Sequence, residues 1–180
     1  MKYTFYWVGN STTGNFGDVL TPKLLDYFGV DYDWTRGSNY NAMCIGSIAR
    51  HARKGTIVLG SGFMSMKNPI DIDADWRFVR GPRSKAKLLQ AGGTTSDVVG
   101  DPALLLPMFC DESKKKYDVG IIPHISQYKW AKEKYPNYHV INLKTKDALS
   151  KAKEITECRT IISSSLHGII AAHAYNIPAA

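Results

Sequence analysis

The sequence predicts an α/β fold in which parallel strands alternate with helices in two successive units. Short apolar runs alternate with helical patterns along most of the 180 residues, which is typical of parallel sheets joined by helical crossovers. A hydrophilic stretch at 110–117, with three consecutive lysines between acidic residues, is the best boundary. We therefore expect an N-terminal unit over residues 1–112 and a C-terminal unit over residues 117–180.

The N-terminal unit is expected to begin with a strand and to contain two recognisable helices. Thr21-Pro22 places an N-cap before a proline at the first helical position, which predicts a short helix through Phe28. Pro82 opens a second helix, and Gly92-Gly93 ends it. The strands expected in this unit are residues 2–8, 42–45, 56–59 and 76–80.

The C-terminal unit is expected to show the same alternation but to be truncated. Three strands are marginal for an independent core, and Ile177-Pro178-Ala179-Ala180 approaches a further strand. Missing strands would leave apolar surface and a sheet edge for a partner chain to cover. The expected elements are strands 117–122, 138–143 and 159–163 and helices 127–134, 146–157 and 166–175. The buried stripe expected on the last helix comprises Leu166, Ile169, Ile170, His173 and Ala174, which makes His173 a core residue.

Composition indicates an ordinary soluble globular protein of the cytoplasm. Hydrophobic residues make up 44% and charged residues 22%, so a disordered chain is not expected. No apolar run approaches the roughly 20 residues that cross a bilayer, and the start of the chain is interpreted as a strand rather than a signal peptide. Cys44, Cys110 and Cys158 lack metal-ligand spacing, so we expect reduced, mostly buried thiols.

The net charge of +7 favours anionic partners such as phosphorylated donors, acidic glycans or membrane-bound carriers. A solvated lysine-rich surface is the simpler explanation of the same charge. No stretch interleaves basic and aromatic residues as a groove for single-stranded nucleic acid requires, so nucleic acid is not an expected partner. No His or Cys pair has metal-ligand spacing, so we expect no metal.

The turn at 161–168 is the strongest local signal in the chain. A β-branched run ends in Ser163-Ser164-Ser165, and a helix then starts with Leu166-His167-Gly168. A strand that feeds a helix N-terminus presents backbone N–H groups and the positive end of the helix dipole, an arrangement that binds carboxylate or phosphate. A histidine there can transfer a proton near neutral pH. The alternative is a well-capped turn in which His167 only bonds a neighbouring carbonyl.

This turn resembles the C-terminal signature of polysaccharide pyruvyl transferases, in which Ser-Ser-x-Leu-His-Gly opens a helix that ends near Asn176-Ile177-Pro178. Five further pieces occur in that family's order and extend the resemblance over nearly the whole chain. They are Gly14-Asn15-Phe16-Gly17-Asp18, Leu59-Gly60-Ser61-Gly62, Val79-Arg80-Gly81-Pro82-Arg83-Ser84, Gly100-Asp101-Pro102-Ala103 and Gly120-Ile121-Ile122-Pro123-His124.

The resemblance implies two Rossmann-like units in a glycosyltransferase-B-like arrangement, the second of them continued by a stretch that this chain does not include. It also implies transfer of the enolpyruvyl carbons of phosphoenolpyruvate to two hydroxyls of a sugar, with release of phosphate and formation of a pyruvate ketal. The acceptor would be a surface or capsular polysaccharide of the cell envelope, or its lipid-linked precursor. Phosphoenolpyruvate is a donor substrate, and no cofactor is expected.

The resemblance assigns catalytic roles to His167, Arg80 and His124. His167 is expected to transfer a proton or bind the donor, and Arg80 follows the apolar strand end Phe78-Val79 and is suited to grip carboxylate or phosphate. His124 ends an apolar strand and either binds the acceptor or acts as a second acid–base group; a histidine bonded to backbone is equally consistent. Arg80 and His167 belong to opposite units, which are expected to bind the substrates together.

Two further sets of residues complete the expected site. One of these residues departs from the family pattern: Ser165 occupies the place of an arginine found in many relatives. The donor-binding set comprises Arg80, Ser163, Ser164, Ser165, His167 and Gly168. The acceptor-binding set comprises Asn15, Gly17, Asp18, Ser61 and His124, although a tight loop in which Asp18 caps the helix is a strong alternative.

Two other functions stay open. A glycosyltransferase of the same architecture would take a nucleotide-sugar donor. Ser165, in place of an arginine, favours this alternative. An inactive fragment would only bind glycan or assemble with a partner. Peripheral association with the inner face of the membrane and formation of a homo-oligomer also stay open.

Overall fold

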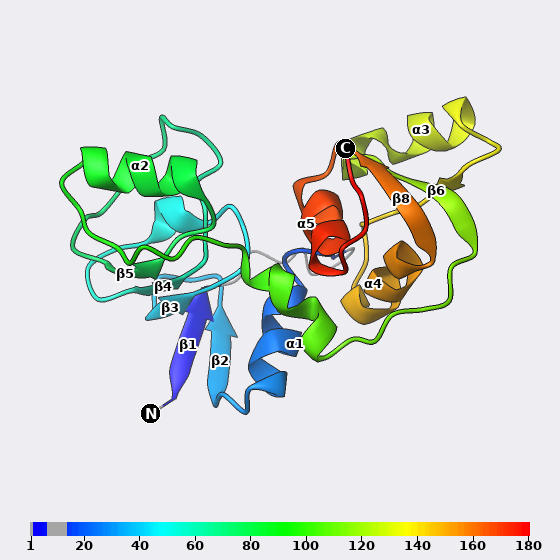
Figure 1. The fold of residues 1–180 in the computed structure, drawn as a ribbon. Coiled ribbons are helices and arrows are strands. Elements are labelled where there is room, and N and C mark those ends of the chain that lie inside the picture. The colour runs from blue at the N-terminus through cyan, green and yellow to red at the C-terminus, as the bar shows by residue number, and fades with distance from the viewer. Residues whose placement is uncertain (1, 7–13) are drawn as a thin grey trace. The chain divides into compact units, whose positions relative to one another are not determined.

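The computed structural model describes residues 2–6 and 14–180 and divides the chain into two compact units, shown in Figure 1. One unit consists of residues 1–8 and 21–102, and the other of residues 9–20 and 103–180. Each unit holds a sheet of parallel strands with helices beside it, so the predicted α/β class with a smaller second sheet is confirmed.

The first unit contains a five-stranded parallel sheet in the order β2-β1-β3-β4-β5. Every strand therefore points its carboxyl end to the same edge of the sheet. The elements are β1 (Tyr3–Tyr6), α1 (Leu20–Tyr27), β2 (Tyr32–Thr35), β3 (Ala42–Met43), a 3-10 turn (Ala49–His51), β4 (Ile57–Leu59), β5 (Asp75–Phe78) and α2 (Pro82–Gln90).

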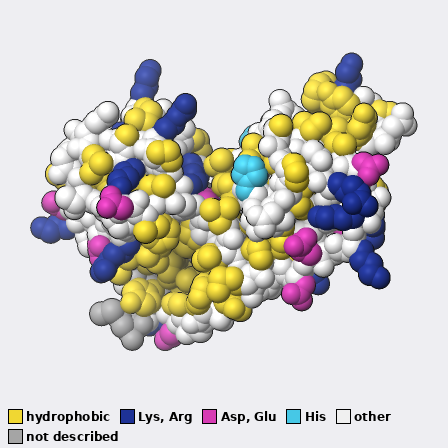
Figure 2. Space-filling model, in the orientation of Figure 1, with side chains coloured by type: hydrophobic (Ala, Val, Ile, Leu, Met, Phe, Trp, Pro, Cys, Tyr) yellow, Lys and Arg dark blue, Asp and Glu magenta, His cyan; other side chains and the backbone are white. Residues whose placement is uncertain are grey.

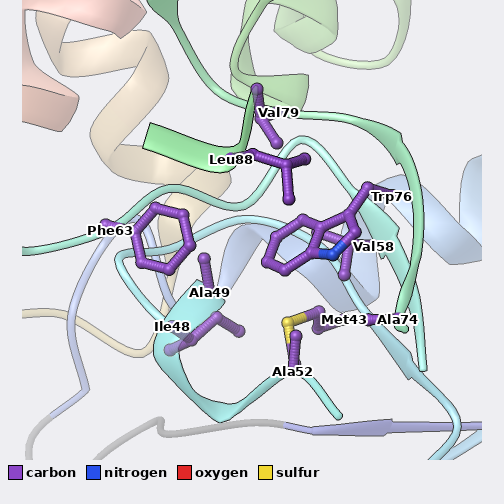
Figure 3. Close-up of a cluster of buried hydrophobic side chains, with 10 residues drawn as sticks. All are labelled: Met43, Ile48, Ala49, Ala52, Val58, Phe63, Ala74, Trp76, Val79 and Leu88. Carbon is purple, nitrogen blue, oxygen red and sulfur yellow. The ribbon is translucent and has the colours of Figure 1, made fainter. Parts of the chain in front are cut away.

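The core of this unit lies on the side of the sheet that α2 covers (Figure 3). Met43, Val58 and Trp76 project from three neighbouring strands, and Leu88 of α2 packs on them with no exposed surface. On the other side of the sheet, Phe5 and Leu25 line an apolar groove of about 560 Å³. Figure 2 shows hydrophobic side chains gathered on this part of the surface.

Strand β2 is the one strand of this unit that was not predicted from the sequence. Its residues alternate in type, with Tyr32 and Thr35 half-buried and Asp33 and Trp34 exposed. It pairs with β1 only, so it is an edge strand with one side open to solvent. Four residues with a carboxylate among them give too short an apolar pattern to distinguish a strand from a loop.

The second unit contains a three-stranded parallel sheet in the order β7-β6-β8. The expected tail strand approaches it, because Ile161 of β8 forms a parallel bridge with Ala179 and Ser163 N–H donates to the carbonyl of Ala180 at 2.7 Å. The elements are a 3-10 helix (Pro102–Met108), β6 (Tyr117–Ile122), a 3-10 turn (Ile125–Gln127), α3 (Tyr128–Lys134), β7 (His139–Val140), α4 (Ala148–Thr156), β8 (Cys158–Ser163) and α5 (Leu166–Ala174).

The buried face of α5 differs from the predicted one. Gly168, Ala171 and Ala172 are its buried residues, whereas His173 is exposed and Leu166 is 46% exposed. The helix turns its small side chains to the sheet because it approaches closely: a Cβ atom at Gly168 would lie 2.8 Å from Cγ2 of Ile122. The predicted apolar stripe and the core role of His173 are therefore wrong, since close approach rather than side-chain size selects this face.

None of the helices within residues 2–6 and 14–180 is long and apolar enough to cross a bilayer.

The three cysteines are free and buried, as predicted. Burial raises the pKa of Cys44 to about 12 and that of Cys158 to about 11, so neither forms a thiolate at neutral pH. We therefore expect the native protein to react with a thiol reagent such as DTNB only slowly, and the denatured protein to release the equivalent of three thiols at once. Rapid reaction of any cysteine without denaturant would contradict this burial.

Candidate active site

In the second unit, two loops follow neighbouring parallel strands and meet at one edge of the sheet. β6 ends at Ile122 and leads into Pro123-His124, and β8 ends at Ser163 and leads through two serines into α5. The two loops are bonded directly, because His124 N–H donates to Oγ of Ser164 at 2.9 Å. The carboxyl edge of parallel strands is where open α/β sheets bind ligands.

The three serines at this turn have different roles within the unit. Oγ of Ser163 donates to the carbonyl of Ile122 at 2.8 Å and accepts from the N–H of Ser165 at 3.0 Å. Oγ of Ser164, which is exposed, donates to Oε1 of Gln127 at 2.9 Å. Ser165 is the N-cap of α5, but its side chain makes no capping hydrogen bond. Ser163 thus holds the turn, while Ser164 is exposed to solvent.

His124 is exposed on the loop that follows β6. Its Nδ1 lies 2.8 Å from Oγ of Ser126 and caps the short turn that begins there. The outer nitrogen of the ring is left for a ligand or solvent, so the structure accommodates both of the roles considered for this residue.

The segment Gly14–Leu20 belongs to this same unit, although it follows the first strand in the chain. Phe16 is fully buried, and its N–H donates to the carbonyl of Leu143 at 2.9 Å. A Cβ atom at Gly14, where φ is +67°, would lie 2.0 Å from the carbonyl oxygen of Thr145, so only glycine fits. This segment, which we call the glycine loop, is thereby fixed against the loop that follows β7.

The glycine loop lies directly against the imidazole of His167. A Cβ atom at Gly17 would lie 2.3 Å from both Cε1 and Nδ1 of that ring. Oδ1 of Asn15 accepts the N–H of Gly17 at 3.2 Å, which keeps the backbone in a tight turn at this point. Asp18 follows immediately; burial raises the pKa of its carboxyl above the usual value, and the interaction with His167 opposes that shift.

In the first unit, Arg80 follows β5 at the carboxyl edge of the larger sheet. Its Nη1 donates to Oγ of Ser47 at 2.8 Å, and a Cβ atom at Gly62 would lie 2.6 Å from the guanidinium carbon. The guanidinium is half-buried; burial lowers its pKa, and the neighbouring Asp101 opposes that change. The side chain is therefore a charged group held in a defined position rather than a freely solvated one.

Two other residues of this edge support the position of Arg80. Asp101 is only 4% exposed, so its charge acts on Arg80 from inside the protein. Ser61 is fully buried; its hydroxyl donates to the carbonyl of Cys44, and its own carbonyl accepts the N–H of Arg80 at 3.1 Å. Asp101 and Ser47 were not assigned functional roles from the sequence. Asp101 belongs to the motif Gly100-Asp101-Pro102-Ala103, whereas no sequence pattern indicated Ser47.

The sequence-predicted residues fall into two groups, one in each unit. Arg80 and Ser61 lie at the carboxyl edge of the five-stranded sheet, and the remaining ones lie at the carboxyl edge of the three-stranded sheet. The second group comprises Asn15, Gly17, Asp18, His124, Ser163, Ser164, Ser165, His167 and Gly168.

The chain is thus a parallel α/β protein of two units, with a histidine at the start of a helix in one unit and an arginine after a strand in the other. The family model for polysaccharide pyruvyl transferases matches residues 17–180, and the chain belongs to that family. It is also 32% identical over 191 aligned residues to an uncharacterized protein of Acanthamoeba polyphaga mimivirus. That alignment covers 98% of this chain and 65% of the length of the viral protein. No solved structure matches the chain at a significant level.

Ser163→Ala should destabilise the second unit, because the Ser165 N–H loses its acceptor and the Ile122 carbonyl keeps only the N–H of Ser164. We expect a loss of about 1–3 kcal/mol in the free energy of unfolding, measured with urea. Ser164→Ala, a change of the same size at an exposed serine, should cost less. Equal losses in the two variants would contradict the structural role of Ser163.

Asp18 should make the stability of the protein depend on pH. The folded state raises the pKa of this carboxyl above 3.8, so folding favours the protonated form and stability falls as pH rises from about 3.8 through the raised value. Asp18→Asn removes this dependence. Urea unfolding at several pH values should show the variant gaining stability relative to the parent as pH rises to 7, and a gap that is constant over this range would contradict the burial of the carboxylate.

Proposed function

We propose that this chain transfers the enolpyruvyl group of phosphoenolpyruvate to two hydroxyls of a saccharide, within a surface polysaccharide or its lipid-linked precursor. The observation that carries the proposal is His167, which the glycine loop fixes at the first turn of α5 in a member of the pyruvyl transferase family. The reaction needs a proton donor and acceptor beside a donor that bears two anionic groups, and an imidazole at a helix N-terminus meets both needs.

Each unit holds positive groups that suit the anionic donor. Phosphoenolpyruvate carries a carboxylate and a phosphate, and in the second unit the first-turn N–H groups of α5 favour such an anion. In the first unit the Arg80 guanidinium, held by Ser47, is suited to bind a carboxylate or phosphate in bidentate fashion. Ser165 supplies no charge where many relatives have arginine, so Arg80 carries more of this task here.

The chemistry balances with these residues alone. The imidazolium of His167 gives its proton to the methylene carbon, whose π bond breaks as the new C–H bond forms, and the adjacent carbon becomes electrophilic. One sugar hydroxyl adds to that carbon and returns its proton to the imidazole. The C–O bond to phosphate then breaks, the second hydroxyl adds in its place, and its proton leaves with phosphate. No electrons are gained or lost by the protein.

The acceptor is assigned to residues around His167 in the second unit. Gly17 is buried and donates its N–H to Oδ1 of Asn15, so the acceptor is assigned to the half-buried Asn15 side chain and to a ring nitrogen of the exposed His124. Side-chain amides and imidazoles bond sugar hydroxyls readily. Ser61 and Ser163 support the turns from inside, and their hydroxyls are already bonded to protein carbonyls.

His167→Ala and Arg80→Ala should each abolish phosphate release from phosphoenolpyruvate in the presence of a saccharide acceptor. We expect a loss of at least about 100-fold, because each removes a group that acts on the reacting atoms. His173→Ala is the control for His167→Ala, because His173 is an exposed histidine of the same helix. Arg83→Ala is the control for Arg80→Ala, because Arg83 is an exposed arginine at the start of α2. Both controls should leave the rate unchanged.

Turnover by the parent protein with both site variants fully active would show that the site is misplaced. Saturable binding of a nucleotide sugar, with no binding of phosphoenolpyruvate, would instead favour the glycosyltransferase alternative.

Gly62→Ala should weaken donor binding with little loss of stability. The added methyl group would meet the guanidinium of Arg80, which is the far end of a flexible side chain and can move away. Because the guanidinium leaves its position, we expect the KM for phosphoenolpyruvate to rise about tenfold, the equivalent of one charge-assisted hydrogen bond. Gly81→Ala, where a Cβ atom meets nothing within 4 Å, is the matched control. An unchanged KM in Gly62→Ala would argue against Arg80 as a donor ligand.

A further inference from the structure

Asp18 and His167 are far apart in the sequence but lie together in the second unit. The backbone of Gly17 lies so close to the Cε1, Nδ1 and Cγ atoms of the imidazole that no side chain fits between them. The next residue along the chain is Asp18, which is half-buried and interacts electrostatically with the same ring. The residue directly before Asp18 therefore packs on the histidine through a contact that only glycine permits.

The position of the carboxylate is fixed independently of any substrate. The glycine loop is anchored by the buried Phe16 ring, by its N–H bond to Leu143 and by the close packing of Gly14 on Thr145. Within the loop, the N–H of Val19 donates to the carbonyl of Asn15 at 3.0 Å, which closes a turn around Asp18. A loop anchored at its start and closed by this turn restricts where Asp18 can reach.

The electrostatic setting of this carboxyl is costly to the fold. Burial disfavours its charged form, and the interaction with His167 offsets only part of that cost. A carboxyl whose pKa is raised by burial, beside a titratable ring, is a candidate functional group.

We propose that Asp18 is a positioning residue for His167: its carboxylate orients the imidazole and stabilises the imidazolium that alternates with the neutral ring during proton transfer. This role rests on the proposed function, and it places Asp18 on the histidine instead of on the sugar acceptor. The carboxylate itself neither gains nor loses a proton in the cycle. It holds the ring in one tautomer while the ring gives its proton to carbon and takes another from a hydroxyl.

Asp18→Asn tests the role in the reaction. The amide keeps the shape and removes the charge, and it relieves a burial cost, so the variant should fold at least as well as the parent. We expect kcat to fall about 10²–10⁴-fold, with the KM for phosphoenolpyruvate changed less than about twofold. Asp118→Asn, at an exposed carboxylate of the same unit, should change neither constant. A rise in KM without loss of kcat would overturn the proposal and favour a direct contact with substrate.

A spectroscopic test separates this inference from the proposed function. In protein labelled with ¹³C and ¹⁵N, His167→Gln should raise the pKa of the Asp18 carboxyl further, because the interaction that lowers it is lost. Asp18→Asn should change the tautomer balance of His167, read from its ring ¹⁵N shifts. His173→Gln, on the exposed side of the same helix, should leave the Asp18 titration unchanged.

The outcomes distinguish two kinds of failure. If neither signal changes, the two side chains are not coupled and the positioning role is wrong, whatever the protein catalyses. If both signals change but the parent protein releases no phosphate from phosphoenolpyruvate, the proposed function is overturned, and the pair must serve another reaction. If both signals change and kcat falls as expected, the proposal stands.

Discussion

The proposed site of the second unit depends on the contact between the backbone of Gly17 and the ring of His167. The segment Gly14–Leu20 belongs to the second unit, where Phe16 is fully buried and Gly17 packs on the imidazole. A methyl group at Gly17 would displace the ring. The contact therefore joins the loop, the helix start and the carboxylate of Asp18 into one arrangement, and the proposed acid–base chemistry follows from it.

The same physical solution recurs in the first unit. Gly62 gives the guanidinium of Arg80 its space, as Gly17 does for the imidazole. A buried or half-buried carboxylate accompanies each charged group, Asp101 for the arginine and Asp18 for the histidine. In both units a glycine leaves space for a proposed site residue, and an acidic residue interacts with that residue. A charged group placed in this way needs less reorganisation when an anionic substrate arrives.

The order of strands and helices, the carboxyl-edge positions of Arg80 and His167 and the family could be predicted, because apolar periodicity and motif spacing are local properties. The edge strand at Tyr32–Thr35 was missed, because one open side leaves it without a continuous apolar pattern. The buried face of α5 was misassigned, since close packing on Ile122 selects Gly168 rather than Leu166. The pairing of Asp18 with His167 joins residues 149 positions apart (167 − 18), and no local signal reports such a contact.

The most direct test is a nuclear Overhauser measurement between the α-protons of Gly17 and the ring protons of His167 in the native protein. The close packing of these two residues predicts a strong cross-peak between the Gly17 α-protons and the Hε1 proton of the ring. A cross-peak of this kind in the absence of any substrate would show that the glycine loop positions the His167 ring before a substrate binds. Its absence, with the ring protons instead close to other residues, would contradict the arrangement from which the site, the mechanism and the role of Asp18 are all derived.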